Sequence, residues 1–403
     1  RDIPADFAER LRTATFTTFR RLLDLCERES PDFLLLAGDV YNQEDASVSA
    51  QLALRDGFRR LESLSIPVFL VHGNHDPLAS RLRSVRWPGN VTVFGELPDA
   101  VPVFRKGEGT PFAIIHGASH ASGRETRNLA ALFRRTEACG LHVGLLHATP
   151  GDADGVARYA PFSQEDLKAS GMDYWALGHI HDRREVCREP LAAYPGCTQG
   201  LHINEPGEKG CLLVTAEARS DGGYAVRTSF RPLGPAVWKT LDMDLGGAAS
   251  LDELENRLRT GLDRAAAEVW SGCEMLLVRL RLQGRTELDG LLRKGTTCAE
   301  LADRLREGGN GVPRIWIKDI DVATRPCVER GALLEREDLL GEVFRLSEAA
   351  RTASGLQALR EGPLAPLFAH ARAGKALEPL TDEELARLLD DAESLCLDLL
   401  END

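Results

Sequence analysis

The chain places polar residues directly behind short apolar runs, four times in order along its first half. The four polar blocks are Gly38-Asp39, Gly73-Asn74-His75-Asp76, His147 and Gly178-His179-Ile180-His181. The apolar runs have the length and continuity of buried strands, as in Phe33-Leu34-Leu35-Leu36-Ala37. Because ligand sites of α/β sheets lie at the carboxyl ends of the strands, we expect the four blocks to meet at one site.

Helix-spaced apolar stripes alternate with these runs. The stripe from Phe7 to Cys26 predicts one helix, and a second helix is expected from about Ser47 to Leu64. Further strands are expected at residues 66–71, 91–94, 112–115, 143–146 and 174–177. This alternation predicts an α/β fold with layered packing.

Three parts are predicted along the chain. Residues 1–235 carry the polar blocks, residues 236–333 read as a small α/β cap, and residues 334–403 read as a helical tail. In the tail, residues 381–402 form a capped amphipathic pattern whose apolar face must be covered. Packing against the chain itself and packing against a partner protein explain this face equally well.

The residue types in the blocks are those of a divalent-metal site. The Asp39 carboxylate can bridge two cations, Asn74 offers an amide oxygen, and the remaining candidate ligands are His147, His179 and His181. This mixture suits Mn²⁺, Zn²⁺ or Fe²⁺. A Gly-Asp or Asn-His pair can also be ordinary turn chemistry, and a single histidine can be a core residue. The order of the blocks behind strands favours ligation.

Other residues near the blocks suggest catalytic and binding roles. His75 can donate a proton to a phosphate oxygen or a leaving group, and Asp76 could hold its imidazole in one tautomer. Arg81, Arg83 and Arg183 follow the blocks closely enough to contact substrate phosphates. The plain alternative is that these arginines belong to a solvated face.

Charge and cysteine content limit the cellular setting. The net charge is −13, but residues 1–236 hold 27 basic and 30 acidic residues, so the excess acid lies away from the blocks. Nine cysteines without a Cys-x-x-Cys pair indicate reduced thiols in a cytoplasmic protein. No apolar run approaches the roughly 20 residues of a membrane span, so we expect no membrane association.

The blocks resemble those of the calcineurin-like metallophosphoesterase superfamily, in particular its DNA repair exonuclease branch of the SbcD and YhaO type. The segment beyond the ligands carries the finer likeness: Tyr194-Pro195-Gly196-Cys197-Thr198-Gln199-Gly200, then Asn204-Glu205 and Lys209-Gly210. The resemblance implies a four-layer α-β-β-α domain with two Mn²⁺ ions. It also implies that Asp39 bridges the two ions. Asn74, His147 and His179 would be the further ligands of one ion, and His181 would be a ligand of the other.

Two departures from the family pattern stand out. The family has an Asp-x-His block at the end of a first strand, and we expect this block to lie upstream of Arg1, so the chain as given should be impaired. Asn42 occupies a position where some members have a histidine.

The function predicted from the sequence is metal-dependent hydrolysis of phosphodiesters, as a DNA exonuclease of DNA repair. A phosphomonoesterase or cyclic-nucleotide phosphodiesterase with the same metal centre, or a catalytically impaired scaffold subunit, remain as alternatives. The resemblance also implies an SbcC-like ABC-type ATPase as partner, which the tail could bind. Whether two copies of the chain form a homodimer is left open.

Overall fold

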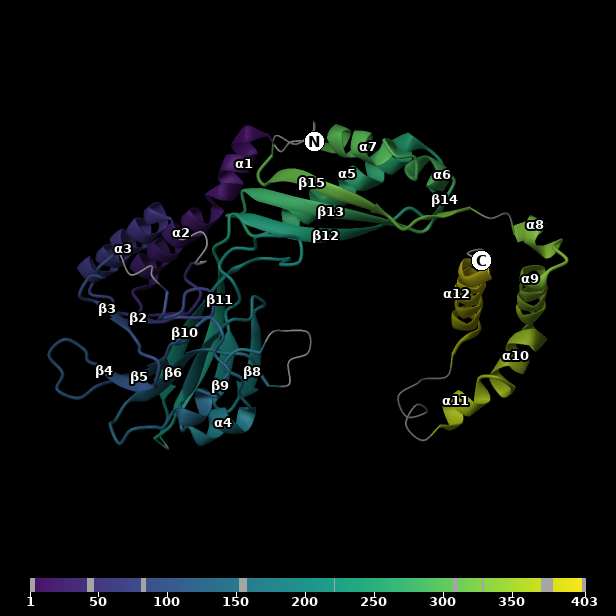
Figure 1. The fold of residues 1–403 in the computed structure, drawn as a ribbon. Coiled ribbons are helices and arrows are strands. Elements are labelled where there is room, and N and C mark those ends of the chain that lie inside the picture. The colour runs from purple at the N-terminus through teal and green to yellow at the C-terminus, as the bar shows by residue number, and fades with distance from the viewer. Residues whose placement is uncertain are drawn as a thin grey trace. The chain divides into compact units, whose positions relative to one another are not determined.

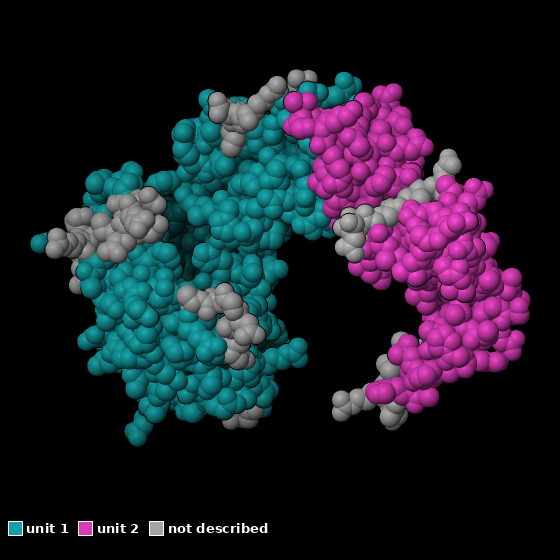
Figure 2. Space-filling model, turned by 45° about the vertical axis from the view of Figure 1, so that its right-hand side comes forward, with its two compact units in different colours: residues 1–243, 255–281, 298–321 teal, residues 244–254, 282–297, 322–403 magenta. Residues whose placement is uncertain are grey.

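The computed structural model describes residues 4–41, 47–80, 85–151, 158–220, 222–306, 311–327, 330–370 and 380–400. Its contacts divide the chain into two compact units, which Figure 2 distinguishes by colour. Unit 1 comprises residues 1–243, 255–281 and 298–321, and unit 2 comprises residues 244–254, 282–297 and 322–403. Within the described residues, no helix combines the length and apolar character that crossing a membrane requires.

Two β-sheets carry the architecture of unit 1 (Figure 1). The first sheet is parallel and has the order β1-β2-β3, with β1 Leu34–Ala37, β2 Val68–Val71 and β3 Val91–Val93. The second has the order β4-β5-β6-β7-β9-β8, with β4 Asp99–Val103, β5 Ala113–Ala118, β6 Leu141–His147, β7 Tyr174–Gly178, β9 Leu191–Tyr194 and β8 Arg184–Arg188. Its four central strands are parallel and both edge strands are antiparallel.

The two sheets pack face to face, and helices cover their outer faces. Phe69 of the first sheet and Leu145 of the second share the core between the sheets. Helices α2 (Ala14–Glu29) and α3 (Val48–Ser63) pack on the outer side of the first sheet. Helix α4 (Gln164–Ala169) and the short helix η1 (Ala130–Leu132) cover the second sheet, where Leu146 and Trp175 are buried. The result is the expected four-layer α-β-β-α arrangement.

Several further elements follow the second sheet along the chain. They are the hairpin β10 (Gly210–Ala218) and β11 (Tyr224–Pro232), the strands β12 (Ala236–Asp244), β13 (Met275–Gln283) and β15 (Arg314–Val322), and the helices α5 (Leu251–Glu268) and α7 (Thr297–Arg306). Strands β12, β13 and β15 form one sheet. Helix α1 (Ala5–Arg12) packs on that sheet, with the rings of Phe7 and Trp316 5.7 Å apart. The single helix predicted over residues 7–26 is therefore two helices, which meet at Thr13.

Unit 2 ends in a group of helices. Its elements are β14 (Arg285–Thr286), α6 (Asp289–Leu292), β16 (Arg325–Pro326), α8 (Arg330–Leu334), α9 (Leu339–Ala350), α10 (Ala353–Glu361), α11 (Ala365–Ala369) and α12 (Asp382–Leu400). Helix α12 packs against α9 through Leu397, which shares a buried cluster with Leu340 and Phe344. An ion pair of 2.6 Å between Arg330 and Glu393 adds a polar contact to this packing. The helical tail predicted from the sequence is thus present.

Candidate metal centre

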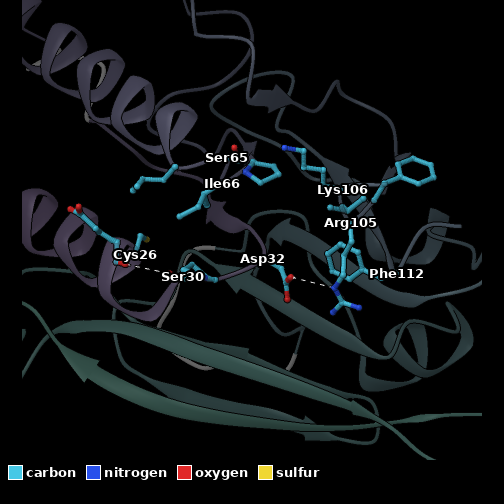
Figure 3. Close-up of a pocket in the computed structure, with 14 residues that line it drawn as sticks. Cys26, Ser30, Asp32, Ser65, Ile66, Arg105, Lys106 and Phe112 are labelled. Carbon is cyan, nitrogen blue, oxygen red and sulfur yellow. Dashed lines mark hydrogen bonds and ion pairs between the residues drawn. The ribbon is translucent and has the colours of Figure 1, made fainter. Parts of the chain in front are cut away.

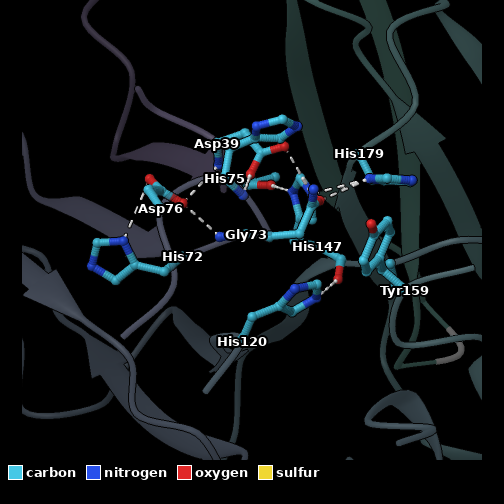
Figure 4. A network of polar contacts seen from close by, with 12 residues as sticks. Asp39, His72, Gly73, His75, Asp76, His120, His147, Tyr159 and His179 are labelled. Carbon is cyan, nitrogen blue, oxygen red and sulfur yellow. Dashed lines mark hydrogen bonds and ion pairs between the residues drawn. The ribbon is translucent and has the colours of Figure 1, made fainter. Parts of the chain in front are cut away.

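Four strand ends of the two facing sheets supply the candidate metal ligands. Strand β1 leads to Asp39, β2 leads to Asn74, β6 ends on His147, and β7 leads to His179. The side chains of these four residues converge, and Figure 4 shows Asp39, His147 and His179 pointing toward one another. The structure therefore brings together four of the five ligands predicted from the sequence.

Glycines allow the strand ends to approach this closely. A Cβ atom on Gly178 would lie 1.7 Å from the carbonyl oxygen of Ala37, so a larger residue would push β7 away from β1. A Cβ atom on Gly73 would lie 2.2 Å from Oδ1 of Asp39 and 2.8 Å from Nε2 of His147. The glycines that flank the polar blocks thus create the space in which the ligands meet.

The His147 imidazole is locked in one tautomer. Its ring is buried, and Nδ1 lies 2.8 Å from the carbonyl oxygen of Ala37. A carbonyl oxygen only accepts hydrogen bonds, so Nδ1 must carry the proton and Nε2 presents its lone pair. The backbone oxygen of His147 in turn accepts a 2.6 Å hydrogen bond from Nε2 of the buried His120. This support is typical of a histidine that ligates a metal.

The distances between the donor atoms fit one divalent ion. Nε2 of His147 lies 3.0 Å from Oδ1 of Asn74 and 3.2 Å from Oδ2 of Asp39. Nδ1 of His179 lies 3.2 Å from the same Asn74 oxygen and 3.3 Å from Nε2 of His147. Donors that bind one ion at about 2.0–2.2 Å lie about 2.8–3.6 Å apart in octahedral or tetrahedral geometry. The four side chains can therefore hold a metal with little rearrangement.

Asp39 supplies negative charge to this cluster. Burial alone would raise the pKa of Asp39, but its contact with the His147 imidazole and the hydrogen bond from the backbone N–H of His75 lower it to about 2. The residue lies in the left-handed region at φ 50°, which turns its side chain out of the strand direction. Asp39 is thus an anion at neutral pH and can ligate a cation.

Asp76 has a different role from the one predicted. Its fully buried carboxylate accepts hydrogen bonds from the backbone N–H groups of Asp39, Val40 and Gly73, at 3.2, 3.0 and 2.7 Å. Its histidine partner is His72, at 3.4 Å, rather than His75 (Figure 4). The prediction that Asp76 holds the His75 imidazole is therefore wrong: its oxygens join the loops that follow β1 and β2.

His75 stands beside the cluster with an exposed side chain. Its backbone N–H donates a 2.9 Å hydrogen bond to Oδ1 of Asp39, which fixes the start of the side chain next to a ligand. On the other side of the cluster, the Tyr159 ring meets the His179 ring edge to face, with centroids 5.3 Å apart. Nothing in the sequence singled out Tyr159, because a lone tyrosine in a loop has no diagnostic spacing.

His181 contacts a different group of residues from the other four candidates. Its Nδ1 lies 2.5 Å from Oε1 of Glu205, and a ligand atom of Cys197 is within 4.8 Å of both residues. Burial raises the pKa of Glu205, but hydrogen bonds from the Leu201 backbone N–H and the His181 ring produce a net lowering. Glu205 was part of the family-like segment, but it was not predicted as a functional residue.

The predicted substrate arginines are only partly described. Arg81, Arg83 and also Asn42 lie outside the residues that the structure describes. Arg183 stands two residues after His181, and its guanidinium carbon lies 3.8 Å from the centroid of the Phe230 ring. Phosphate contact by Arg183 stays a prediction.

A separate hollow lies at the opposite end of strands β1 and β2 (Figure 3). Asp32 and Ile66, which precede these strands, line it together with Arg105 and Phe112. None of the candidate metal ligands lines this hollow. The chemistry predicted from the sequence therefore belongs to the carboxyl ends of the strands.

Comparison with known proteins matches two family models to separate parts of the chain. A model described as calcineurin-like phosphoesterase matches residues 12–183, and one described as metallophosphoesterase YhaO, middle domain, matches residues 238–325. The chain is 33% identical over 367 residues to the uncharacterized metallophosphoesterase YhaO of Bacillus subtilis (strain 168), an alignment that covers 90% of this chain and 86% of that relative.

More distant relatives are DNA repair proteins. The chain is 26% identical over 285 residues to the DNA double-strand break repair protein Mre11 of Aeropyrum pernix, covering 65% of this chain and 64% of that protein. The Mre11 of Sulfurisphaera tokodaii is 26% identical over 179 residues, covering 42% and 43% of the two chains. A solved structure, TT1561 of Thermus thermophilus, aligns at a TM-score of 0.30 and 14% identity, over 52% of this chain and 92% of that one. At that score, it carries no argument about the fold.

Proposed function

The chain belongs to the YhaO family of calcineurin-like metallophosphoesterases, and we propose that it is a metal-dependent phosphodiesterase that acts on DNA as an exonuclease in DNA repair. One observation carries this proposal. Asp39, Asn74, His147 and His179 present four donor atoms at the spacing that one divalent ion requires, with the His147 lone pair aimed at the others. Such a preformed donor set suits phosphoryl chemistry with a bound metal.

The residues around the donor set have defined tasks in this proposal. The chemistry that divalent ions supply at such a site is charge neutralisation of the phosphate and a lowered pKa of water. His75, exposed beside Asp39, donates a proton to the departing oxygen or a hydrogen bond to the phosphate. Asp76 keeps the loops of Asp39 and Gly73 in register, so that His75 and the ligands stay in one geometry.

We propose two Mn²⁺ ions as the cofactors. The donor set of one carboxylate, one amide oxygen and two imidazoles is of the intermediate hardness that Mn²⁺ accepts. His181 is the described candidate for the second ion, and Asp39 would bridge the two. The ions would also add positive charge where residues 1–236 carry 30 acidic against 27 basic residues, which favours a polyanionic substrate.

DNA is the proposed substrate because the more distant relatives are Mre11 proteins of DNA double-strand break repair. The matching test is cleavage of linear duplex and single-stranded oligonucleotides with Mn²⁺, compared with a phosphomonoester and a cyclic nucleotide. In a protein that also carries the Asp-x-His block, we expect degradation of DNA from its ends and loss of this activity in EDTA. Hydrolysis of the small substrates without cleavage of DNA would contradict the proposal.

A substitution tests the role of His75 within the same assay. We expect His75→Ala to reduce DNA hydrolysis by about 10²–10⁴-fold, because the proton donor is lost, while the Mn²⁺ content stays unchanged. The control is His370→Ala, which replaces an exposed histidine of the helical tail. Wild-type turnover by the His75 variant would contradict the assignment.

We further propose that the helical tail binds an SbcC-like ABC-type ATPase. Helix α12 buries Leu385 and Leu397 against its own unit, yet Leu388 is 46% and Leu395 59% exposed. These two leucines are seven residues apart, so they lie on one side of the helix, as residues of a helix-helix contact do. The exposed side supports a partner, since the packing of α12 on α9 does not use it.

All nine cysteines lie within the described residues and none of them forms a disulfide, which suits a reducing compartment, and we therefore propose a cytoplasmic location.

A further inference from the structure

The segment of residues 194–210, which resembles the YhaO type, contacts the turn that carries His181. The backbone N–H of Cys197 donates a 3.1 Å hydrogen bond to the carbonyl oxygen of His181. Nζ of Lys209 donates to the same oxygen and to Oδ1 of Asp182, both at 3.2 Å. Gly196 has a φ of 81°, and a Cβ atom there would lie 2.7 Å from the His181 oxygen. The beginning and the end of the segment therefore both fix the backbone of residue 181.

The middle of the segment fixes the His181 side chain. Glu205 is buried, and its Oε2 accepts a 2.7 Å hydrogen bond from the backbone N–H of Leu201. Its Oε1 lies 2.5 Å from Nδ1 of His181, whereas Nε2 of His202 is 3.6 Å away and beyond hydrogen-bonding distance. The Glu205 carboxylate is thus held by the backbone on one side and directed at one imidazole nitrogen on the other.

The hydrogen bond determines which nitrogen of His181 is open. A carboxylate only accepts, so Nδ1 carries the proton and Nε2 of the neutral ring has the free lone pair. The side chain of His181 is 55% exposed, and Nε2 has no polar partner among the residues that the structure describes. The same logic applies to His147, where the Ala37 carbonyl oxygen takes the Nδ1 proton and Nε2 faces the other ligands.

We propose that Glu205 is a positioning residue that fixes the tautomer and the ring orientation of His181, so that Nε2 of His181 ligates the second divalent ion. This inference deepens the proposed function and rests on it. A carboxylate in this position also makes the imidazole a better ligand, because it stabilises the positive charge that the ring acquires on binding a cation.

The alternative is that His181, Cys197 and Glu205 themselves form the ligand shell of an ion. The distance of 2.5 Å between Nδ1 and Oε1 argues against it. If both atoms bound one ion at about 2.1 Å, the angle between the two bonds would close to about 70°, well below the roughly 90–110° of octahedral or tetrahedral sites. A shared proton fits this distance, and a shared metal does not.

Mn²⁺ titration by calorimetry tests the proposal on the full chain. We expect Glu205→Ala to reduce the affinity for the more weakly bound Mn²⁺ ion by about 10–100-fold and to leave the affinity for the more tightly bound ion unchanged. Glu205→Gln should lose less, because its amide oxygen can still accept from Nδ1. The matched control is Glu208→Gln in the same segment. The Glu208 carboxylate accepts a 2.8 Å hydrogen bond from the backbone N–H of Trp270, and its replacement should leave the affinity for both ions unchanged.

A second readout needs no metal. In ¹⁵N-histidine-labelled protein, the resonance lost in His181→Gln identifies His181, and we expect the wild-type ring to be protonated on Nδ1 and the Glu205→Ala ring to become a mixture of tautomers. A wild-type ring protonated on Nε2 would overturn the proposal. So would unchanged Mn²⁺ affinity in Glu205→Ala, or a Cys197→Ala variant that loses the ion as fully as Glu205→Ala. Absence of DNA hydrolysis with these results intact would refute the proposed function alone.

Discussion

Replacing Gly73 with Ala should separate metal binding from folding. Ordinary contact begins at 3.4 Å, and the new Cβ atom would lie only 2.2 Å from Oδ1 of Asp39, more than an ångström too close. The clash falls on the far end of a side chain, so the fold can relax at a cost of about 1–3 kcal/mol. The ligand cannot relax in the same way, because a shift of about 1 Å removes a donor from a bond of about 2.0–2.2 Å.

We therefore expect Gly73→Ala to reduce the affinity for the more tightly bound Mn²⁺ ion by at least about 100-fold, or about 2.7 kcal/mol. The free energy of unfolding should fall by no more than the relaxation cost of about 1–3 kcal/mol, so that the variant stays folded. Calorimetric titration and denaturant unfolding of the metal-free protein measure the two effects. The control is Gly95→Ala, since Gly95 also stands two residues beyond a strand of the same sheet and a Cβ atom there would meet nothing within 4 Å. Wild-type affinity in Gly73→Ala would refute the geometry of the site.

Three further outcomes are expected. Asp76→Asn should lower the free energy of unfolding by about 1–3 kcal/mol, measured by denaturant titration, because its amide group cannot accept all the backbone N–H groups that the carboxylate accepts; unchanged stability would contradict this. Burial and the nearby His142 lower the pKa of His116 from 6.5 to about 4, so its contribution to stability is fully present above pH 6.5 and is lost as the pH falls to about 4. The free energy of unfolding should therefore fall by roughly 3 kcal/mol between pH 6.5 and about pH 4, as denaturant titration at each pH would measure. His116→Gln should make this pH dependence shallower, and an equally steep profile in the variant would contradict the assignment to His116. Leu388→Glu with Leu395→Glu should abolish co-purification with an SbcC-like ATPase and leave the melting temperature and short-substrate cleavage unchanged, whereas a large drop in melting temperature would show that these leucines belong to the chain's own core.

The convergence of the site could be predicted because it depends on local patterns. Apolar runs predicted the strands that lead to the site, and ligand sites of α/β sheets lie at the carboxyl ends of their strands, so Asp39, Asn74, His147 and His179 were expected near one another. Strands β4 and β8 at the sheet edges were not predicted, because a proline interrupts β4 and charged residues flank the two apolar ones in β8. The buried strands β9 and β12 were not predicted either, so the patterns found most of the central strands but not all of them.

The supporting contacts could not be predicted, because they join positions that no spacing rule connects. Glu205 reaches His181 across 24 residues, and the Ala37 carbonyl oxygen reaches His147 across 110. Asp76 is adjacent to His75 in sequence, but the turn buries its carboxylate under the backbone of Asp39 and Gly73. Their proximity in sequence suggested a catalytic pair, whereas in the folded loop the Asp76 carboxylate joins two segments of backbone by hydrogen bonds.

The location of bound Mn²⁺ tests the central claim most directly. Crystals of the chain grown with Mn²⁺ should give an anomalous difference peak within about 2.0–2.3 Å of Oδ2 of Asp39, Oδ1 of Asn74, Nε2 of His147 and Nδ1 of His179. These four atoms already lie 3.0 to 3.3 Å apart in the pairs that the structure records. No peak among them in crystals with saturating Mn²⁺, or a peak elsewhere with these side chains still hydrogen-bonded to one another, would contradict the account.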